Sequence, residues 1–116
     1  MITFALYLIR QNMTRSETVQ AIQIILHREL PDATAILFGS EARGDARCDS
    51  DVDVLILLDK EKITLRDRQK VTYPLYDVEL ETGIVISPKV FSKKQWETQL
   101  SITPFYKNVM KEGVLL

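Results

Sequence analysis

The amino-acid sequence predicts a small α/β domain, of the α+β kind, in which helices pack on one mixed β-sheet. Short apolar segments that end at glycine or proline alternate with longer stretches in which apolar residues recur every three or four positions. The first pattern is typical of buried strands and the second of amphipathic helices. A chain of 116 residues has room for one such core but not for two. We therefore expect a single domain over residues 13–116.

The first half of this domain is predicted to contain a helix and two strands. The helix begins at Ser16, a good N-cap residue, and ends near Pro31. Residues 34–38 are apolar and predict a buried strand, and residues 40–47 predict a turn that opens a brief helix. Residues 51–58 predict a second strand. Its later half is entirely aliphatic, so we expect it to be covered on both faces and to lie at the centre of the sheet.

The second half is predicted to contain a long helix, a third strand and two shorter helices. The long helix covers residues 60–81 and contains Pro74, where a backbone donor is missing and a bend is expected. Residues 83–87 predict the third strand, which is expected to end at the following proline. The two shorter helices are expected over residues 92–100 and around residues 105–110.

Residues 1–12 are expected to be an N-terminal extension that precedes the domain. Their apolar run from Ile2 to Ile9 is far shorter than the ~20 residues of a membrane-spanning helix. It also lacks the basic segment and the small-residue cleavage site of a signal peptide. Met13, just before the first helix, is the expected natural start.

Composition makes several partners and compartments unexpected. Hydrophobic residues make up 46% of the sequence, charged residues make up 27%, and the formal net charge is -1. This balance gives no general attraction to nucleic acid or to an anionic membrane, so we expect neither as a partner. The lone cysteine, Cys48, cannot form an internal disulfide, and we expect a cytoplasmic protein.

Three aspartates, Asp49, Asp51 and Asp53, occupy alternate positions that lead into the second predicted strand. Because side chains two residues apart on a strand point to the same face, Asp51 and Asp53 should stand side by side. Two adjacent carboxylates repel each other, and a divalent cation between them converts this repulsion into coordination. Mg²⁺ suits the pair, because it takes few protein carboxylates and completes its shell with water and phosphate oxygens. The pair therefore predicts a Mg²⁺ site that takes a phosphate-bearing ligand.

The turn after the first predicted strand offers a place for that phosphate. Gly39 has no side chain, so a phosphate can approach the backbone closely, and Ser40 contributes a hydroxyl. The amides that follow open a short helix, where anions bind. Together with the aspartate pair, this turn is expected to hold a metal and a nucleoside triphosphate at one end of the sheet.

The combination of a Gly-Ser pair at 39–40, ten further residues and an Asp-Val-Asp segment at 51–53 resembles the nucleotidyltransferase fold of the polymerase beta superfamily. The similarity covers residues 34–59 closely and is greatest to the minimal nucleotidyltransferases, small prokaryotic proteins often encoded beside a HEPN-type partner. It implies Mg²⁺-dependent transfer of a nucleoside monophosphate, AMP from ATP, to a hydroxyl acceptor. The implied acceptor is a tyrosine of a HEPN-type toxin, which would make this chain an antitoxin.

The resemblance also assigns roles to individual residues. It implies that Gly39 and Ser40 bind the triphosphate, and that Asp51 and Asp53 bind Mg²⁺ in a site that can hold two ions. Arg43 either neutralises phosphate charge or forms an ion pair with a neighbouring aspartate, Asp45 or Asp49. Because so small a member has no room for an acceptor domain, a second chain is expected to complete the site in a homo- or hetero-oligomer.

One feature of the family is missing from this sequence. Active members carry a third carboxylate on the strand after the long helix, and the segment GIVISPKVF contains no acid. Glu79 and Glu81, just before that strand, are the candidates to replace it. If neither does, the alternative function is a catalytically impaired homologue that binds a nucleotide or a protein partner as an antitoxin module.

The acidic segment fits a calcium loop less well than a Mg²⁺ site. An EF-hand loop that begins at Asp49 would place Val54 and Lys60 where glycine and glutamate belong. A solvated acidic turn is the remaining structural interpretation. His27 and Cys48 are expected to be incidental, because each lacks the partners of a metal or nucleophile site. A basic cluster after the third strand is either a solvated helix start or a phosphate contact, and comprises Lys89, Lys93 and Lys94.

Overall fold

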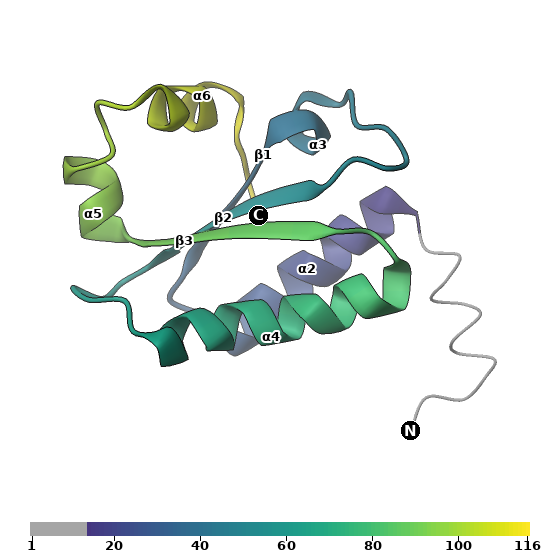
Figure 1. Ribbon diagram of the computed structural model, residues 1–116, viewed down its shortest axis with the longest axis horizontal. Helices are drawn as coiled ribbons and strands as arrows, with labels where there is room; N and C mark the ends of the chain where they lie inside the picture. Colours follow the sequence, from purple (N-terminus) through teal and green to yellow (C-terminus); the bar gives the residue numbers. More distant parts are fainter. Residues whose placement is uncertain (1–13) are drawn as a thin grey trace.

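Four strands form one mixed sheet in the computed structural model, which describes residues 14–116 (Figure 1). Their order across the sheet is β3-β2-β1-β4. β1 runs antiparallel to β2 and to β4, whereas β2 and β3 are parallel. The predicted mixed α/β fold and the central position of the second strand are confirmed. The strands are β1 (Thr34–Phe38), β2 (Val52–Leu58), β3 (Ile86–Ser92) and β4 (Val114–Leu115).

Helices cover both faces of this sheet. On one face α2 (Arg15–Glu29) and α4 (Leu65–Thr82) lie side by side, and on the other face lie α5 (Lys93–Thr98) and α6 (Pro104–Glu112) (Figure 1). The short helix α3 (Gly39–Arg43) connects the end of β1 to the loop that precedes β2. The long helix α4 forms the crossover between the parallel strands β2 and β3.

The central strand β2 contributes to a separate hydrophobic cluster on each face. Its even-numbered residues, Val52 to Leu58, pack in the larger cluster with α2 and α4. Leu55 and Leu57 pack in the smaller cluster with Trp96 and Val109. Because side chains alternate along a strand, Asp53 points to the same face as Leu55 and Leu57. The face that carries α5 and α6 is therefore the face on which the aspartate stands.

The first helix begins earlier than expected. Its N-cap is Thr14 and not Ser16, because Thr14 and Glu17 form a capping box in which each side chain accepts a hydrogen bond from the other residue's backbone N–H. Ser16 lies within the first turn. The Thr-x-x-Glu spacing was present in the sequence, and it is a stronger start signal than a serine alone.

The prediction that a proline ends the third strand is wrong, since β3 continues through Pro88 to Ser92. Within residues 14–116, β3 is an edge strand whose one partner is β2. Val85 accepts a hydrogen bond from the Val52 amide across this pair at 2.8 Å, so by alternation the nitrogen of Pro88 points away from β2. Proline removes no bond of the ladder at such a position.

Side chains of α4 satisfy the outward-facing backbone groups on either side of this proline. The Glu79 carboxylate accepts a hydrogen bond from the Ile86 amide at 2.9 Å, and the Arg68 guanidinium donates one to the Val90 carbonyl at 3.3 Å. Two side chains of α4 therefore satisfy backbone groups along the outer edge of β3.

The long helix begins at Leu65 and not at residue 60. Thr64 and Asp67 form a second capping box, and Lys60 donates to Asp67 Oδ1 at 2.5 Å. The hydrogen bond from Lys60, followed by those from Thr64, holds the pKa of the Asp67 carboxyl well below its usual range. The loop 60–64 thus belongs to the helix cap, and the helix continues through Pro74 to Thr82.

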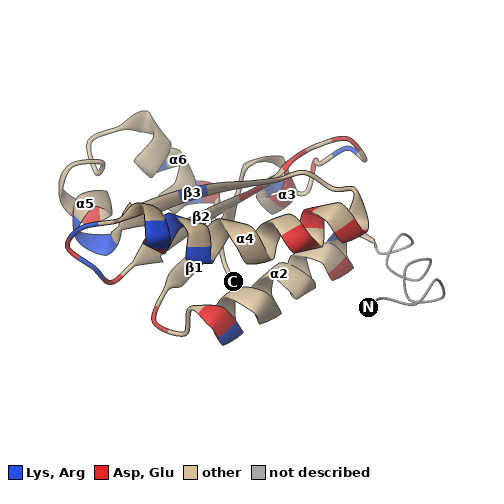
Figure 2. Ribbon diagram, turned by 60° about the horizontal axis from the view of Figure 1, so that its bottom comes forward, with Lys and Arg blue, Asp and Glu red and all other residues tan. Residues whose placement is uncertain are grey.

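Charges are unevenly distributed along α4 (Figure 2). Apart from the capping Asp67, its first half carries basic residues, and its last turn carries no basic residue. Carboxylates near a helix C-terminus interact unfavourably with the helix dipole. At Glu79, the hydrogen bond from the Ile86 amide offsets this effect.

The C-terminal end of the chain adds a fourth strand to the sheet. β4, which the sequence did not predict, adds two residues antiparallel to β1. No helix within residues 14–116 is long and apolar enough to cross a membrane. The expected extension over residues 1–12 lies outside the described residues.

Candidate nucleotide and metal site

The Gly-Ser turn and the second aspartate of the pair meet where β1, α3 and β2 join. β1 ends at Phe38, whose register partner on β2 is Asp53. Gly39 follows with φ +72°, and a Cβ atom at this position would overlap a carboxylate oxygen of Asp53. Glycine is therefore favoured for two reasons, the left-handed backbone and the Asp53 side chain packed against it. Gly39 belongs to the first half of the sequence motif and Asp53 to the second. The fold brings these two residues into contact.

Asp53 is partly buried and lies near charges of both signs. Burial raises the pKa of the Asp53 carboxyl, and the charge of Asp51 raises it further, whereas Lys89 and Arg43 act in the opposite direction. Asp51 is exposed and precedes the first residue of β2, so the strand begins one residue later than predicted. A carboxyl whose pKa is raised by a neighbouring carboxylate is a group that a bound cation would stabilise in its charged form.

On the other side of Asp53 the neighbouring strand β3 presents a hydroxyl and an ammonium group. Ser87 is the register partner of Asp53 in the parallel pair, and Lys89 is the next β3 residue on the same face. Lys89 is exposed, and its charge lowers the Asp53 pKa. From the sequence, Lys89 was identified only as part of a basic cluster, and Ser87 was not singled out. The signal that identifies both is the parallel register of β3 with β2.

The two glutamates named as replacements for a third carboxylate lie on α4, across the sheet from the face of Asp53. Glu79 is engaged with the Ile86 amide at the outer edge of β3. Glu81 lines a cavity between α2 and α4 together with Arg28 and Asp77. Within residues 14–116, no group of three or more His, Cys, Asp or Glu side chains is arranged to hold a metal ion. The structure does not bring either glutamate to the aspartate pair, and their catalytic assignment stays a prediction.

Arg43 forms the ion pair with Asp45 that was one of its two expected roles. Its Nε lies 3.3 Å from Asp45 Oδ2, and its Nη1 lies 3.4 Å from Glu112 Oε2 of α6. The hydrogen bond to Asp45 raises the pKa of the guanidinium first, and the one to Glu112 adds to this. The contact with α6 was not predicted, because it depends on how the C-terminal helix packs.

A small cavity opens beside the Gly-Ser turn on the same face of the sheet. Its volume is about 250 Å³, and both aromatic and polar side chains line it. Such mixed lining suits a ligand that has a flat ring and a few hydrogen-bonding groups. The lining includes Phe38, Gly39, Arg43, Phe105, Asn108 and Glu112.

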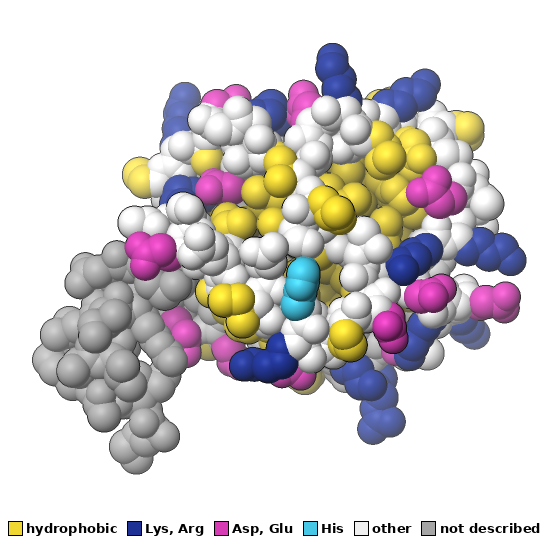
Figure 3. Space-filling model, turned by 180° about the vertical axis from the view of Figure 1, so that it is seen from behind, with side chains coloured by type: hydrophobic (Ala, Val, Ile, Leu, Met, Phe, Trp, Pro, Cys, Tyr) yellow, Lys and Arg dark blue, Asp and Glu magenta, His cyan; other side chains and the backbone are white. Residues whose placement is uncertain are grey.

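Two other reactive side chains, His27 and Cys48, were expected to be incidental. His27 is exposed, and its Nε2 lies 3.1 Å from the carbonyl oxygen of Leu116; it is the cyan side chain in Figure 3. Cys48 is an exposed, unpaired cysteine in the loop before β2. Among the described residues neither belongs to a group of metal-ligating side chains.

Comparison with known proteins agrees with this geometry. Residues 19–116 match the family model of the nucleotidyltransferase domain. "Putative protein adenylyltransferase MJ0141" of Methanocaldococcus jannaschii is 50% identical over 58 residues, which make up 50% of this chain and 58% of that protein. The chain thus spans little more than half the length of this curated relative.

Solved structures share the same arrangement of strands and helices. The chain in "Structure of putative minimal nucleotidyltransferase" superposes with a TM-score of 0.58 at 26% identity, over 90% of this chain and 99% of that one. "Crystal structure of the toxin-antitoxin with AMP-PNP" superposes with a TM-score of 0.52 at 16% identity, over 88% of this chain and 72% of that one, which shows a common fold. The family model and the Gly-Ser turn packed against the aspartate strand lead to one conclusion: the chain belongs to the nucleotidyltransferase domain family.

Proposed function

We propose that this protein is a Mg²⁺-dependent nucleotidyltransferase that transfers AMP from ATP to a hydroxyl group of a protein. The observation that carries the proposal is the packing of Gly39 against Asp53, because it puts a backbone suited to phosphate beside a carboxylate suited to a cation. Membership of the nucleotidyltransferase family supports the reaction class, and the name of the curated relative supports a protein acceptor and adenylate.

Asp51 and Asp53 would hold the Mg²⁺. Burial first, and then the charge of Asp51, raise the pKa of the Asp53 carboxyl, and an oxygen-preferring dication would relieve the unfavourable interaction between the two carboxylates. When bound, Mg²⁺ would supply charge neutralisation at the α-phosphate and at the departing pyrophosphate. Around it, Gly39 leaves room for phosphate oxygens and Ser40 offers a hydroxyl donor. Arg43 and Lys89 add positive charge on the two flanks of Asp53.

A specific observation supports the alternative function as well. Ser87 and not a carboxylate is the β3 neighbour of Asp53, so this strand supplies no strong base for the acceptor hydroxyl. In the alternative, the chain binds a nucleotide or a partner protein without efficient transfer. The two functions differ in whether a covalent product forms.

For the partner we propose a HEPN-type toxin, whose tyrosine accepts the adenylate in the cytoplasm, so that this chain acts as the antitoxin. The common fold with a chain of a toxin-antitoxin structure that contains AMP-PNP supports this partner class.

The test is incubation of the full chain with α-labelled ATP, Mg²⁺ and the protein encoded by the neighbouring gene. We expect label on the partner, and we expect Asp51→Ala and Asp53→Ala each to lower the rate by about 100-fold or more, as removal of a metal ligand does. Asp77→Ala, which removes an exposed carboxylate of α4, is the matched control and should not change the rate. Label that persists in both site variants would refute the proposal. Tight binding without label would favour the alternative.

A further inference from the structure

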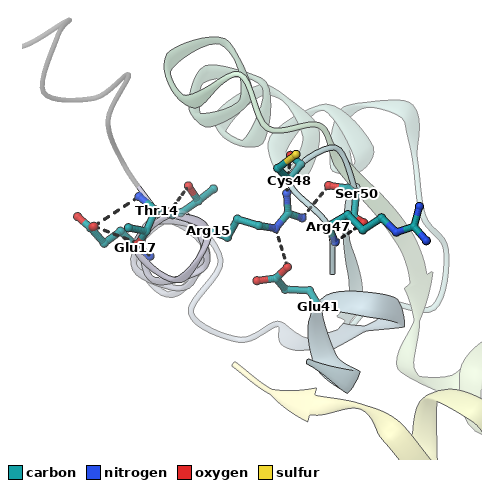
Figure 4. A network of polar contacts seen from close by, with 8 residues as sticks. Thr14, Arg15, Glu17, Glu41, Arg47, Cys48 and Ser50 are labelled. Carbon is teal, nitrogen blue, oxygen red and sulfur yellow. Dashed lines mark hydrogen bonds and ion pairs between the residues drawn. The ribbon is translucent and has the colours of Figure 1, made fainter. Parts of the chain in front are cut away.

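Arg15, in the first turn of α2, reaches across to both segments that carry the candidate site (Figure 4). Its Nε donates to Glu41 Oε2 at 2.9 Å, its Nη2 donates to the Ser50 carbonyl at 2.6 Å, and its Nη1 donates to the Cys48 carbonyl at 3.3 Å. The side chains of Arg15 and Glu41 are only 19% and 13% exposed. One guanidinium thus joins three elements: α2, α3 and the loop that precedes β2.

The two segments that Arg15 joins are those that present the motif residues. Glu41 directly follows Ser40 in α3, and Ser50 directly precedes Asp51. The loop is also closed on itself, because the Arg47 amide donates to Ser50 Oγ at 2.8 Å and the Ser50 amide donates to the Arg47 carbonyl at 3.1 Å (Figure 4). Arg15 therefore binds a preformed turn and holds it at a set distance from α3.

This contact differs from an ordinary surface ion pair. An exposed pair between flexible side chains contributes little to stability. Here the planar guanidinium fork meets a carboxylate and two carbonyl oxygens at the same time, which restricts the orientation of all three groups. A lysine offers a single point charge and cannot reproduce the fork. Asp51 follows the clamped Ser50 directly and lies outside β2, between the loop and the first strand residue.

We propose that Arg15 is a positioning residue of the site: by clamping the 47–50 turn to α3, it holds Asp51 beside Asp53 and the Gly-Ser turn. The inference rests on the proposed function for its catalytic consequence, but not for the clamp itself. Arg15 acts through Asp51 and makes no contact with the substrate in this assignment. Without the clamp, the α3–β2 loop loosens while the strand that follows it stays paired.

The experiment compares Arg15→Gln and Arg15→Lys with Arg28→Gln in the full chain. Arg28, on the same helix, pairs with Glu29 through side chains that are 68% and 48% exposed, so Arg28→Gln removes an arginine ion pair far from the site. Hydrogen exchange of the amides of residues 44–51 measures the clamp. Titration with Mn²⁺ in the presence of a non-hydrolysable ATP analogue, followed by electron paramagnetic resonance, measures metal binding.

We expect Arg15→Gln to speed exchange in residues 44–51, to leave exchange in β2 unchanged, and to weaken Mn²⁺ binding by about 10- to 100-fold, the usual effect of losing a residue that orients a ligand. Arg15→Lys should resemble Arg15→Gln, and Arg28→Gln should resemble the wild type. Should Arg15→Gln fail to fold, Glu41→Gln tests the same clamp, with a smaller increase in loop exchange expected. Unchanged exchange in residues 44–51, or a uniform increase over the whole chain, would overturn the inference.

A further variant separates the clamp from the proposed function. Asp51→Asn should abolish Mn²⁺ binding and leave loop exchange as in the wild type. If Asp51→Asn binds Mn²⁺ normally, the proposed metal site is wrong, whereas the exchange data still decide whether the clamp exists. If Asp51→Asn loses Mn²⁺ and Arg15→Gln binds it as the wild type does, the positioning role is wrong and the metal site stands.

Discussion

Gly39 shows how one residue connects backbone conformation with site chemistry. Its φ of +72° disfavours any side chain, and the Asp53 carboxylate occupies the space that a Cβ would need. Gly44 has a similar φ of +79°, but a Cβ there would meet nothing within 4 Å. A comparison of Gly39 with Gly44 therefore separates the free-energy cost of backbone strain from the cost of displacing Asp53.

The first prediction uses this comparison. We expect Gly44→Ala to destabilise the protein by about 1 kcal/mol through backbone strain alone, and Gly39→Ala to cost about 1–3 kcal/mol more, because Asp53 must also move. Chemical denaturation gives the two free energies of unfolding. Gly39→Ala should also weaken Mn²⁺ binding, and Gly44→Ala should not. Equal losses of stability in the two variants would contradict the steric role of Asp53.

At the scale of single residues, the sequence identified the motif but not its surroundings. Gly39 and Asp53 meet because β1 and β2, which are close along the chain, pair with each other, and the motif spacing indicated this contact. Arg15 and Ser87 were missed because their roles depend on contacts made 35 and 34 residues away in the chain, Arg15 with Ser50 and Ser87 with Asp53. No local pattern marks such residues.

Among the elements, the contact between α4 and β3 gives Glu79 a structural role. The helix crosses from β2 to β3, and its Glu79 carboxylate closes the outer backbone edge at Ile86. This hydrogen bond needs only an acceptor oxygen, which glutamine also has. A catalytic carboxylate, in contrast, needs its charge.

The second prediction follows from this difference. We expect Glu79→Gln to retain both stability and transferase activity, and Glu79→Ala to lose about 1–2 kcal/mol of unfolding free energy, because the part-buried Ile86 amide would lose its partner. Thermal or chemical denaturation and the labelling assay provide the two readouts. Loss of activity in Glu79→Gln with unchanged stability would instead identify Glu79 as the third catalytic carboxylate.

Element boundaries also show the limits of local patterns. The helix starts at Thr14 and Thr64 carry the full capping-box spacing, and reading that spacing would have placed both correctly. The extent of β3 was misjudged because an edge position tolerates Pro88, and edge or centre is decided by the whole sheet. β4 has two residues and exists only through its pairing with β1.

For the molecule as a whole, the raised pKa of Asp53 links the proposed metal site to stability. Asp53 has a raised pKa, so between the unfolded value of about 3.8 and the folded value the native state binds more protons than the unfolded state. Stability from this group is therefore lost as the pH rises through that window. At neutral pH the metal-free protein bears the full cost of the charged Asp53.

The third prediction tests this cost. We expect Asp53→Asn to raise the midpoint of thermal unfolding of the metal-free protein at pH 7, and the gain to shrink as the pH is lowered below the raised Asp53 pKa. Added Mg²⁺ should stabilise the wild type, by about 2.7 kcal/mol at 100 times its dissociation constant, and should not stabilise the variant. Asp77→Asn is the control for a general effect of charge. A lower midpoint for Asp53→Asn in the absence of metal would show that Asp53 is structural.

The course of β3 also limits how a second chain can approach this molecule. Strand addition requires a row of unoccupied N–H and C=O groups along a sheet edge. On the outer side of β3, Pro88 has no N–H to donate, the Ile86 amide is taken by Glu79, and the Val90 carbonyl is taken by Arg68. These three positions disfavour the addition of a strand along this edge, so under the proposed function we expect a protein acceptor to approach β3 through side-chain contacts.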